Sequence, residues 1–470
     1  MMPDSTPLAP AAPMPAGTMV AIFVPDNHPL LLLRQKLDWA AIREVLSKHW
    51  RRAGKNVDGG PGRPWPVDLY MSVLVFKVLW SLHSRRVETD LRENAAARLF
   101  IGVEAQTDPQ VRDHANIARA EAALGEEGWR EFNQVVLRQA VAEGYAKPEI
   151  LSSDTTAQEP LIGHPNEAGI LRGLAQRVYR SVVKIQETVQ EKLVPGLEQA
   201  REAAKEIFRK VKEYHLFTKG KEAKDRVIRE LVAGTERLLT SSQEIIRELS
   251  ASGARKVKAG VKTLTEMVET GRTLLPQILH WLDEKKVAVG KILHAGITGA
   301  RAVVRNKVGK KVEFGFKWLI NRLEGGYVFG NVVAANADEY QMPIKALESY
   351  RETLGEKQTP EMVIYDRGGD SAETIRELQD AGVKKVGIMP KGTKEWSVAV
   401  EDQAEVRSQR GKTEGVIGTL KSTKCGFNQR RERSNGAVRA AGHRAIACLN
   451  LTRFLKDIIG QTKEPEVAEV

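Results

Sequence analysis

The chain has 470 residues, which is too long for one ordinary compact core and predicts two to four structural units. Its 72 lysines and arginines against 60 aspartates and glutamates give a formal net charge of +12, which favours a polyanionic partner. Nucleic acid is the first candidate and an acidic membrane surface the second. The two cysteines, Cys425 and Cys448, are too few for a disulfide framework and indicate a reducing compartment. No segment approaches about 18 uninterrupted apolar residues, so we expect a soluble, cytoplasmic protein without a membrane span.

The amino-terminal third divides into a lead and a helical domain. The first eighteen residues are rich in Pro and Ala and lack a basic start, so residues 1–36 are expected to form a disordered or weakly ordered lead and not a signal peptide. From 37 to 145 apolar residues recur at spacings of three and four, which predicts an all-α domain. Its segment HSRRVETDLR fits a DNA-reading helix and equally a packing helix with a solvated charged face.

A strand and a long insertion follow. In EILSSDTTAQ an apolar pair leads into a polar stretch, so residues 146–170 are expected to contain a buried strand that leaves the sheet at Asp154. Residues 171–305 are dense in Glu, Lys and Arg, with Val, Ile and Leu at helical spacing, which predicts an antiparallel helical insertion. Its charges alone do not choose between an interaction element and a DNA-bridging element.

After residue 308 the apolar period changes from 3.6 to 2. Apolar residues alternate from Val312 to Ile320, a Glu-Gly-Gly turn follows, and YVFGNVVAA returns, which predicts a β-hairpin. The apolar run MVIY then ends at Asp366, and further helices and a strand alternate after it. Residues 306–460 are therefore expected to join residues 146–170 in one α/β domain, with 461–470 as a polar tail.

Three acidic residues are candidates for chemistry. Asp366 stands at the carboxyl end of an apolar strand, where open α/β sheets bind ligands, and Asp154 has a similar setting. Taken singly, each Asp is more simply explained as a residue that begins a turn. If residues 404–424 are helical, Glu414 shares a stripe roughly 60° wide with cations. These cations are Arg407, Arg410 and Lys421. A carboxylate flanked by cations suits a metal ligand beside phosphates.

The region around Glu414 is strongly basic. Residues 407–444 hold ten Lys or Arg against two Glu, a net +8. We expect them to contact the DNA backbone without reading its sequence, although a solvated basic helix pair remains the alternative. The candidate DNA-binding residues are Arg407, Arg410, Lys421, Lys424, Arg430 and Arg431. Three glycines beside the stripe, Gly411, Gly415 and Gly418, would leave smooth backbone for a bulky polymer.

Together these segments resemble the DDE transposases of bacterial insertion sequences, whose catalytic domain is RNase H-like. The resemblance covers roughly residues 60 to 455 apart from the insertion, and it rests on SSDTTAQEP, KKVEFGFKWLI, VIYDRGGDS and RGKTEGVIGTLK. The family often carries Tyr, Arg, Glu and Lys with two, three and six residues between them. Arg410, Glu414 and Lys421 keep this spacing, while Arg407 stands where Tyr is expected.

The resemblance implies an α/β fold: an RNase H-like mixed sheet with flanking helices, preceded by an all-α DNA-binding domain at 37–145 and interrupted by a helical insertion. It also implies that the strands bearing Asp154 and Asp366 are neighbours and that the helix bearing Glu414 packs across them. These three residues would be catalytic metal ligands for Mg²⁺ or Mn²⁺, with two ions serving DNA cleavage and strand transfer. The implied partners are double-stranded DNA at the element ends and target, and a second copy of the chain on that DNA, at the bacterial nucleoid.

Other functions stay open at this point. One is a DNA-binding protein descended from a transposase but catalytically silent. Another is a related RNase H-like nuclease or integrase, and a third is a helical scaffold, which residues 171–305 suggest. The scaffold leaves the placement of all three acids unexplained.

Overall fold

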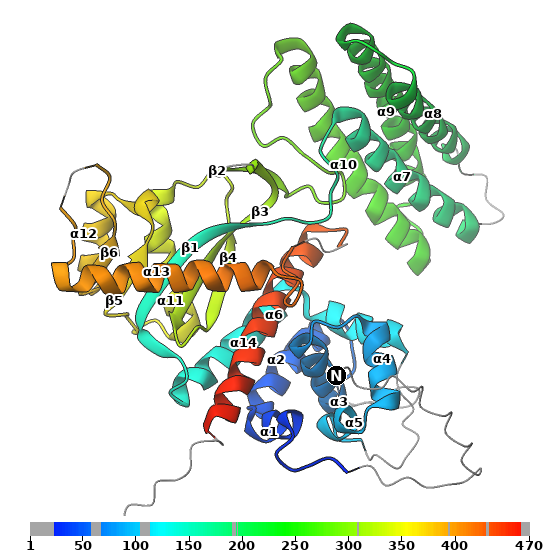
Figure 1. Cartoon of the computed structure of the whole chain (residues 1–470). Helices are drawn as coiled ribbons and strands as arrows, with labels where there is room; N and C mark the ends of the chain where they lie inside the picture. The colour runs from blue at the N-terminus through cyan, green and yellow to red at the C-terminus, as the bar shows by residue number, and fades with distance from the viewer. Residues whose placement is uncertain are drawn as a thin grey trace, which may run out of the picture.

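The computed structural model describes residues 23–57, 67–103, 113–189, 194, 196–307, 310–392, 395–428 and 432–461. Within them the chain forms an amino-terminal helical domain, a mixed sheet flanked by helices, and a helical bundle (Figure 1). None of the helices in these ranges is long and apolar enough to cross a lipid bilayer.

The amino-terminal domain starts earlier than the sequence predicts. It consists of α1 (Pro29–Lys36), α2 (Trp39–Arg52), α3 (Val67–Leu79), α4 (Ser84–Glu93), α5 (Ala95–Ile101) and α6 (His114–Ala142). Helix α1 falls within the expected disordered lead, yet Leu30 and Leu33 are buried in the core. Asp38 is the N-cap of helix α2, and its carboxylate accepts a hydrogen bond from the Ala41 amide.

The sheet is mixed and has six strands. They are β1 (Lys147–Gln158), β2 (Arg301–Lys307), β3 (Lys310–Glu324), β4 (Val328–Val333), β5 (Met362–Tyr365) and β6 (Lys385–Ile388). The order is β2-β3-β1-β5-β6, with β4 also paired to β3. The pairings β1–β3 and β3–β4 are antiparallel, whereas β1–β5 and β5–β6 are parallel. This sheet with its flanking helices is consistent with the RNase H-like class that the sequence predicts. The predicted hairpin is β3–β4, whose turn uses positive φ at Gly325 and Gly326.

The structure corrects the prediction that β1 leaves the sheet at Asp154. Strand β1 continues to Gln158 and pairs with β3 along this stretch, so Asp154 lies opposite Ile320 in mid-strand. The polar residues beyond it are buried, and Gln158 has partners on both sides. The Gln158 amide accepts from the Trp318 indole at 2.9 Å and donates to the Val438 carbonyl at 2.8 Å. The polar second half of β1 therefore did not indicate a buried strand, because its hydrogen-bond partners lie far along the chain.

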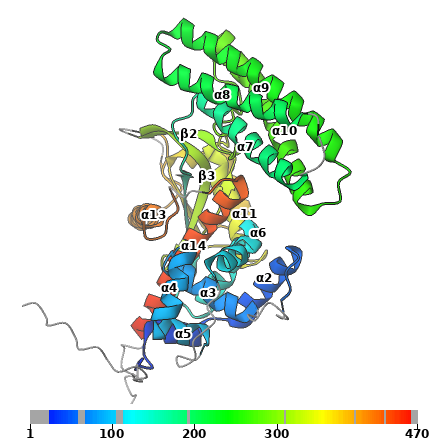
Figure 2. The same ribbon diagram turned by 90° about the vertical axis from the view of Figure 1, so that its right-hand side faces the viewer.

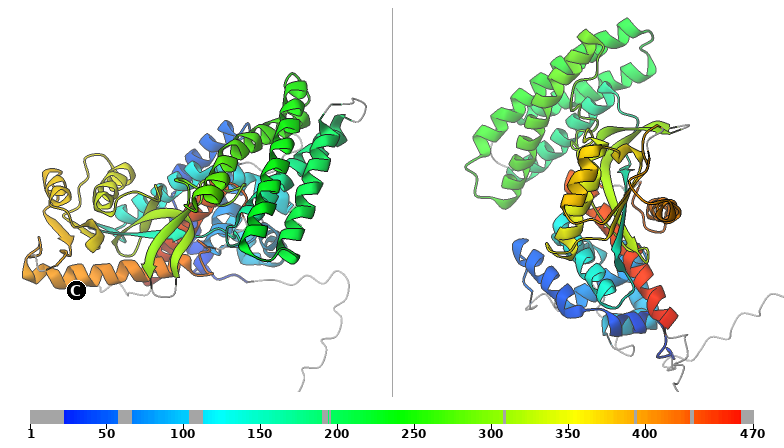
Figure 3. Two further views of the ribbon diagram at one scale, coloured as in Figure 1. Left: turned by 90° about the horizontal axis from the view of Figure 1, so that it is seen from above. Right: turned by 90° about the vertical axis from the view of Figure 1, so that its left-hand side faces the viewer.

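Helices cover both faces of the sheet. Helix α13 (Val400–Lys421) lies on one face, and α11 (Met342–Leu354) lies on the other (Figure 2). The right-hand view of Figure 3 shows α13 end-on, clear of the sheet's other helices. The short helices η1 (Glu339–Gln341), η2 (Arg367–Gly369) and α12 (Ala372–Asp380) connect the strands on the α11 side.

The last helix, α14 (Asn435–Gln461), joins the sheet to the amino-terminal domain. The Asn133 side chain on α6 donates to the His443 carbonyl at 2.8 Å. The Asn450 side chain accepts from the Val328 amide at 2.9 Å and donates to the Val328 carbonyl at 2.7 Å, which fixes α14 on β4. The two domains therefore share one core.

The insertion is an antiparallel bundle with an apolar core of its own. It comprises α7 (Glu167–Val189), α8 (Leu197–Leu216), α9 (Lys221–Leu249) and α10 (Arg255–Glu284). The predicted helical insertion to residue 305 is wrong at its end, because Arg301–Lys307 form β2 and pair with β3. The apolar pattern of RAVVR does not distinguish a strand from the helices before it. Only its pairing with β3 identifies it as a strand.

The buried histidine of α14 is expected to make stability depend on pH. His443 is completely buried and packs edge-on against Trp318, and burial, with Arg130 and Arg439 nearby, lowers its pKa to about 3. An unfolded histidine titrates near 6.5, so below that pH the unfolded state takes up a proton that the folded state refuses. Lowering the pH from 7 to 5 should cost about 2 kcal/mol through this residue.

Chemical denaturation of the His443→Leu protein at several pH values tests this. The variant should lose that part of the pH dependence, whatever its stability at pH 7. His280→Gln, at an exposed position of α10, serves as control and should keep the pH dependence of stability that the wild type shows. Equal pH slopes for wild type and His443→Leu between pH 7 and 5 would contradict the prediction.

Candidate active site

Asp154 lies on β1, and Asp366 directly follows the last residue of β5, the parallel strand next to β1. The β1–β5 pairing runs up to Ser152 opposite Ile364. Two residues further on, the same register brings Asp154 opposite Asp366, whose backbone is still extended. Residues two apart in a strand share a face, and adjacent strands are about 4.8 Å apart. The two carboxylates therefore project from one face, side by side.

Each of these carboxylates also serves its local backbone. Asp366 Oδ1 accepts from the Gly368 amide at 2.8 Å and so begins the turn of η2. Asp154 Oδ1 accepts from the Thr155 amide at 2.7 Å. Asp366 therefore does begin a turn, which is the simpler explanation from the sequence. This turn role is compatible with its position beside Asp154.

Helix α13 covers the face that carries both aspartates. Its Thr413 hydroxyl donates to the Ser152 hydroxyl at 2.7 Å, and Ser152 shares a face with Asp154. Earlier in the helix, Val406 packs closely on Gly387 of β6. A Cβ added to Gly387 would be 2.7 Å from the Val406 side chain. The helix therefore crosses from β6 to β1, and the turn that contains Thr413 also carries Glu414 (Figure 1).

Glu414 stands at the exposed edge of this helix. Its side chain is 62% exposed, and its carboxylate lies 3.4 Å from the Arg410 guanidinium. In the part of the chain that the structure describes, only Glu88, Asp113 and His114 bring three possible ligand atoms within 4.8 Å of one another. The structure thus places the two aspartates on the sheet face that α13 covers and Glu414 at the exposed edge of that helix, but does not close the three acids into such a compact group.

A fourth acid, Glu339, binds the two aspartate strands from the opposite face of the sheet. Its Oε2 accepts from the Tyr365 hydroxyl at 2.6 Å, and its Oε1 lies 2.8 Å from the Lys317 ammonium and 3.4 Å from the Thr155 hydroxyl. Tyr365 is on β5, Lys317 on β3 and Thr155 on β1. One carboxylate therefore ties three strands together.

The contacts of Glu339 are made by the immediate neighbours of the aspartates. Tyr365 precedes Asp366 and Thr155 follows Asp154, so strand alternation turns these partners away from the aspartates. Glu339 also contacts the turn after Asp366, since a Cβ added to Gly368 would lie 3.1 Å from the Cβ of Glu339. Glu339 is thus placed to fix the positions of both aspartates.

The charge states of this cluster follow from its contacts. Burial raises the pKa of Glu339, but hydrogen bonds from Lys317 and Tyr365 outweigh it and leave the pKa below its usual value. Burial raises the pKa of Tyr365, and the charges of Glu339, Asp366 and Asp154 raise it further. Glu339 is therefore ionised and Tyr365 is neutral at pH 7.

Sequence reasoning missed Glu339 because DEYQ resembles an ordinary surface turn. The available signal was its partner, since Lys317 lies within the apolar strand FGFKWLI and is 6% exposed. A lysine buried in a strand requires an anion nearby, so an acid had to be sought in another element.

The predicted DNA-binding cations differ in their surroundings. The Arg407 guanidinium stacks over the Trp396 ring at 5.3 Å, which gives a role to the residue at the expected Tyr position. Lys421 is 22% exposed and lies 3.8 Å from Glu313 of β3, so it packs against the sheet. Arg410 faces Glu414.

The remaining predicted cations extend beyond α13. Lys424 is exposed just after the helix. Arg430 and Arg431 lie outside the described residues. A Cβ added at each of the three α13 glycines, Gly411, Gly415 and Gly418, would have no atom within 4 Å, so the strip beside Glu414 is open. This agrees with the expectation of smooth backbone.

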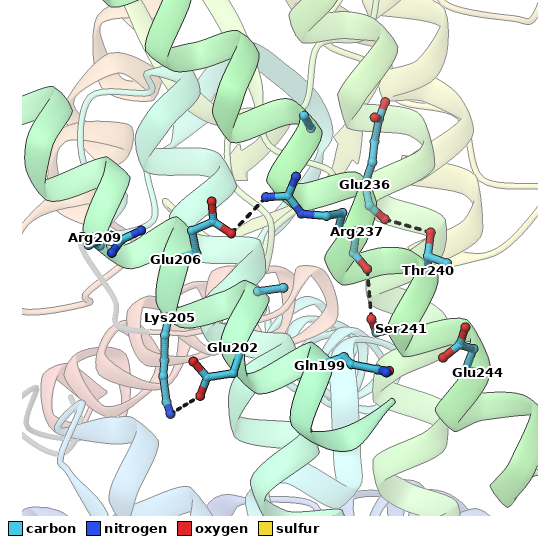
Figure 4. Close-up of a pocket in the computed structure, with 12 residues that line it drawn as sticks. Gln199, Glu202, Lys205, Glu206, Arg209, Glu236, Arg237, Thr240, Ser241 and Glu244 are labelled. Carbon is cyan, nitrogen blue, oxygen red and sulfur yellow. Dashed lines mark hydrogen bonds and ion pairs between the residues drawn. The ribbon is translucent and has the colours of Figure 1, made fainter. Parts of the chain in front are cut away.

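A groove of about 1040 Å³ lies elsewhere, between α8 and α9 of the bundle (Figure 4). Four of its charged side chains form two ion pairs, with Arg237 2.9 Å from Glu206 and Lys205 2.5 Å from Glu202. It contains none of the three predicted acids. We therefore assign it no part in the site.

The sheet and its helices place the chain in the α/β class, consistent with an RNase H-like fold. Residues 19–122 match the family model described as a transposase domain (DUF772). This match supports a transposase family. No curated protein and no solved structure matches the chain. The matched residues belong mainly to the amino-terminal helices, so this finding is independent of the geometry of the three acids.

Proposed function

We propose that the chain is a DDE-type transposase that cleaves DNA and transfers its strands, with Asp154, Asp366 and Glu414 as catalytic carboxylates. The observation that carries the proposal is the register of β1 and β5, which sets the two aspartates side by side under α13. The transposase-domain match in the amino-terminal helices supports the same conclusion.

The three carboxylates suit Mg²⁺ or Mn²⁺, which prefer oxygen ligands. The aspartates are held by strands, whereas Glu414 is held by an exposed pair with Arg410 four residues away. Such a pair is worth only about 0.3–0.5 kcal/mol, so Glu414 can turn towards an ion at little cost. Two bound ions would activate the attacking water or 3′-hydroxyl and stabilise the leaving oxygen.

The surroundings of the carboxylates favour a DNA substrate. The open glycine strip of α13 lets a phosphodiester backbone approach Glu414; Arg410 supplies positive charge beside it, and Lys424 adds an exposed cation after the end of the helix. Transposition requires two element ends, so we further propose that a homodimer or larger assembly forms on DNA.

A cleavage assay tests this function. The substrate is a supercoiled plasmid carrying the DNA that flanks the gene, together with a second plasmid as target. We expect nicked and linear products with Mg²⁺ or Mn²⁺, joined products with the target, and no reaction in EDTA. Cleavage without joining would favour a nuclease. DNA binding without cleavage in either cation would favour a catalytically silent relative, and each of these results contradicts the proposal.

A further inference from the structure

The cations of the bundle occupy two different kinds of surface. On α8 and α9 many of them are neutralised by acids of the bundle itself. The pairs are Arg201–Glu198, Lys205–Glu202, Lys210–Glu230, Arg237–Glu206 and Arg229–Asp283. This side therefore offers little net charge to a partner.

The other surface lies at the end of the bundle where α7 ends and α10 begins. We call it the basic tip, and it consists of Arg180, Lys184, Arg255, Lys256, Lys258 and Lys262. All six side chains are exposed, and none has an ion pair within the described residues. The sequence contains no acid between residues 168 and 186 or between 255 and 265. Their positive charge is therefore directed to solvent.

Close helix packing brings these cations together. The Ser181 hydroxyl of α7 donates to the Gly260 carbonyl of α10 at 3.0 Å, and a Cβ at Gly260 would lie 2.5 Å from Ile185. At 100° per residue, Lys184 lies about 60° from Ser181 and Lys256 about 40° from Gly260. Both flank the seam between the two helices, whereas Lys258 and Lys262 lie about 160° from Gly260, so the positive charge continues from the seam around the outer side of α10.

The basic tip lies near the amino-terminal helical domain, on the opposite side of the sheet from α13 (Figure 2). In Figures 1 and 2 this end of α7 and α10 lies above the amino-terminal helical domain, which contains most of the transposase-domain match. A DNA duplex bound to the amino-terminal domain on the side that faces the bundle would therefore lie next to the basic tip.

We propose that the basic tip binds the phosphate backbone of duplex DNA. The inference rests on the proposed function, which makes DNA the substrate. Duplex DNA carries one negative charge about every 1.7 Å along its axis, so it matches a group of exposed cations that form no ion pairs within the described residues. Contacts of this kind position DNA without reading its sequence.

Salt-dependent DNA binding tests the tip in the full chain. The tip variant combines Arg180→Gln, Lys184→Gln, Lys256→Gln and Lys262→Gln. The matched control removes four exposed cations at the opposite end of the bundle, through Lys212→Gln, Lys219→Gln, Lys221→Gln and Arg226→Gln. If each tip cation contacts one phosphate, the log-log salt slope should fall by about 3.6 in the tip variant. The control should keep the wild-type slope, and both should keep the wild-type circular dichroism spectrum.

The outcomes separate this inference from the proposed function. A wild-type chain that neither binds nor cleaves the flanking DNA would refute the proposed function. Wild-type cleavage with equal salt slopes for the tip variant and the control would overturn the inference alone. If the tip variant keeps its slope on DNA but loses binding to phosphatidylserine vesicles, the surface serves a membrane and the inference is also overturned.

Discussion

Replacing Asp366 or Asp154 by Asn is expected to reduce metal-dependent DNA cleavage by about 10³-fold. A metal ligand that stabilises developing charge contributes several kcal/mol to the transition state, and each 1.36 kcal/mol is a factor of ten in rate. Asn keeps the Oδ1 atom that accepts from the Gly368 amide at position 366 and from the Thr155 amide at position 154. The local backbone should therefore survive while the negative charge is lost.

Initial rates of plasmid nicking at saturating Mg²⁺ measure this effect, and gel-shift titrations check that DNA binding stays within a few-fold of wild type. Asp380→Asn is the matched control, because this exposed acid at the end of α12 lies outside the site. An Asp366→Asn protein that keeps a tenth or more of the wild-type rate would remove Asp366 from the catalytic assignment.

Glu339→Gln is expected to lower both stability and the affinity for divalent metal. Loss of the charge leaves the Lys317 ammonium buried without its anion. Breaking a fully buried pair costs about 3–5 kcal/mol, and we expect about 2 kcal/mol here because the Glu339 side chain is 40% exposed. The partners that fix Asp154 and Asp366 also loosen, so the Mg²⁺ concentration for half-maximal cleavage should rise about 10-fold.

A double variant separates positioning from stability. Adding Lys317→Met removes the uncompensated charge and should restore much of the free energy of unfolding. The higher Mg²⁺ requirement should remain, since Tyr365 and Thr155 still lack their ionised partner. Glu348→Gln, on the exposed side of α11, controls for the loss of one acid. If the double variant recovers the wild-type Mg²⁺ requirement, Glu339 acts through stability alone.

Local patterns were enough to predict elements whose apolar period is clear. The alternation from Val312 to Ile320 predicted the β3–β4 hairpin, and the helical period predicted the bundle from the segment after Leu171. The apolar run before Asp366 correctly indicated a buried strand, because all four residues of β5 are buried.

Features that depend on distant partners escaped prediction. The second half of β1 is polar, and it is buried only because β3 and α14 supply hydrogen bonds to residues such as Gln158. Strand β2 follows a long helical insertion and needs β3 to define it. The role of Glu339 requires Lys317, Thr155 and Tyr365 from three different strands. No single stretch of sequence contains this information.

The bundle is inserted between β1 and β2, so it separates Asp154 from Asp366 and Glu414 in the order of their synthesis. Asp154 emerges first, and the whole bundle, with its separate apolar core, is synthesised before the strand that leads to Asp366. Glu414 follows on α13, and α14 comes last although it packs against α6 near the start. A nascent chain that has emerged only as far as α12 therefore has both aspartates but lacks Glu414 and the helix that joins the domains. Unfinished chains cannot assemble the proposed catalytic set, so cutting activity would wait until translation has passed α13.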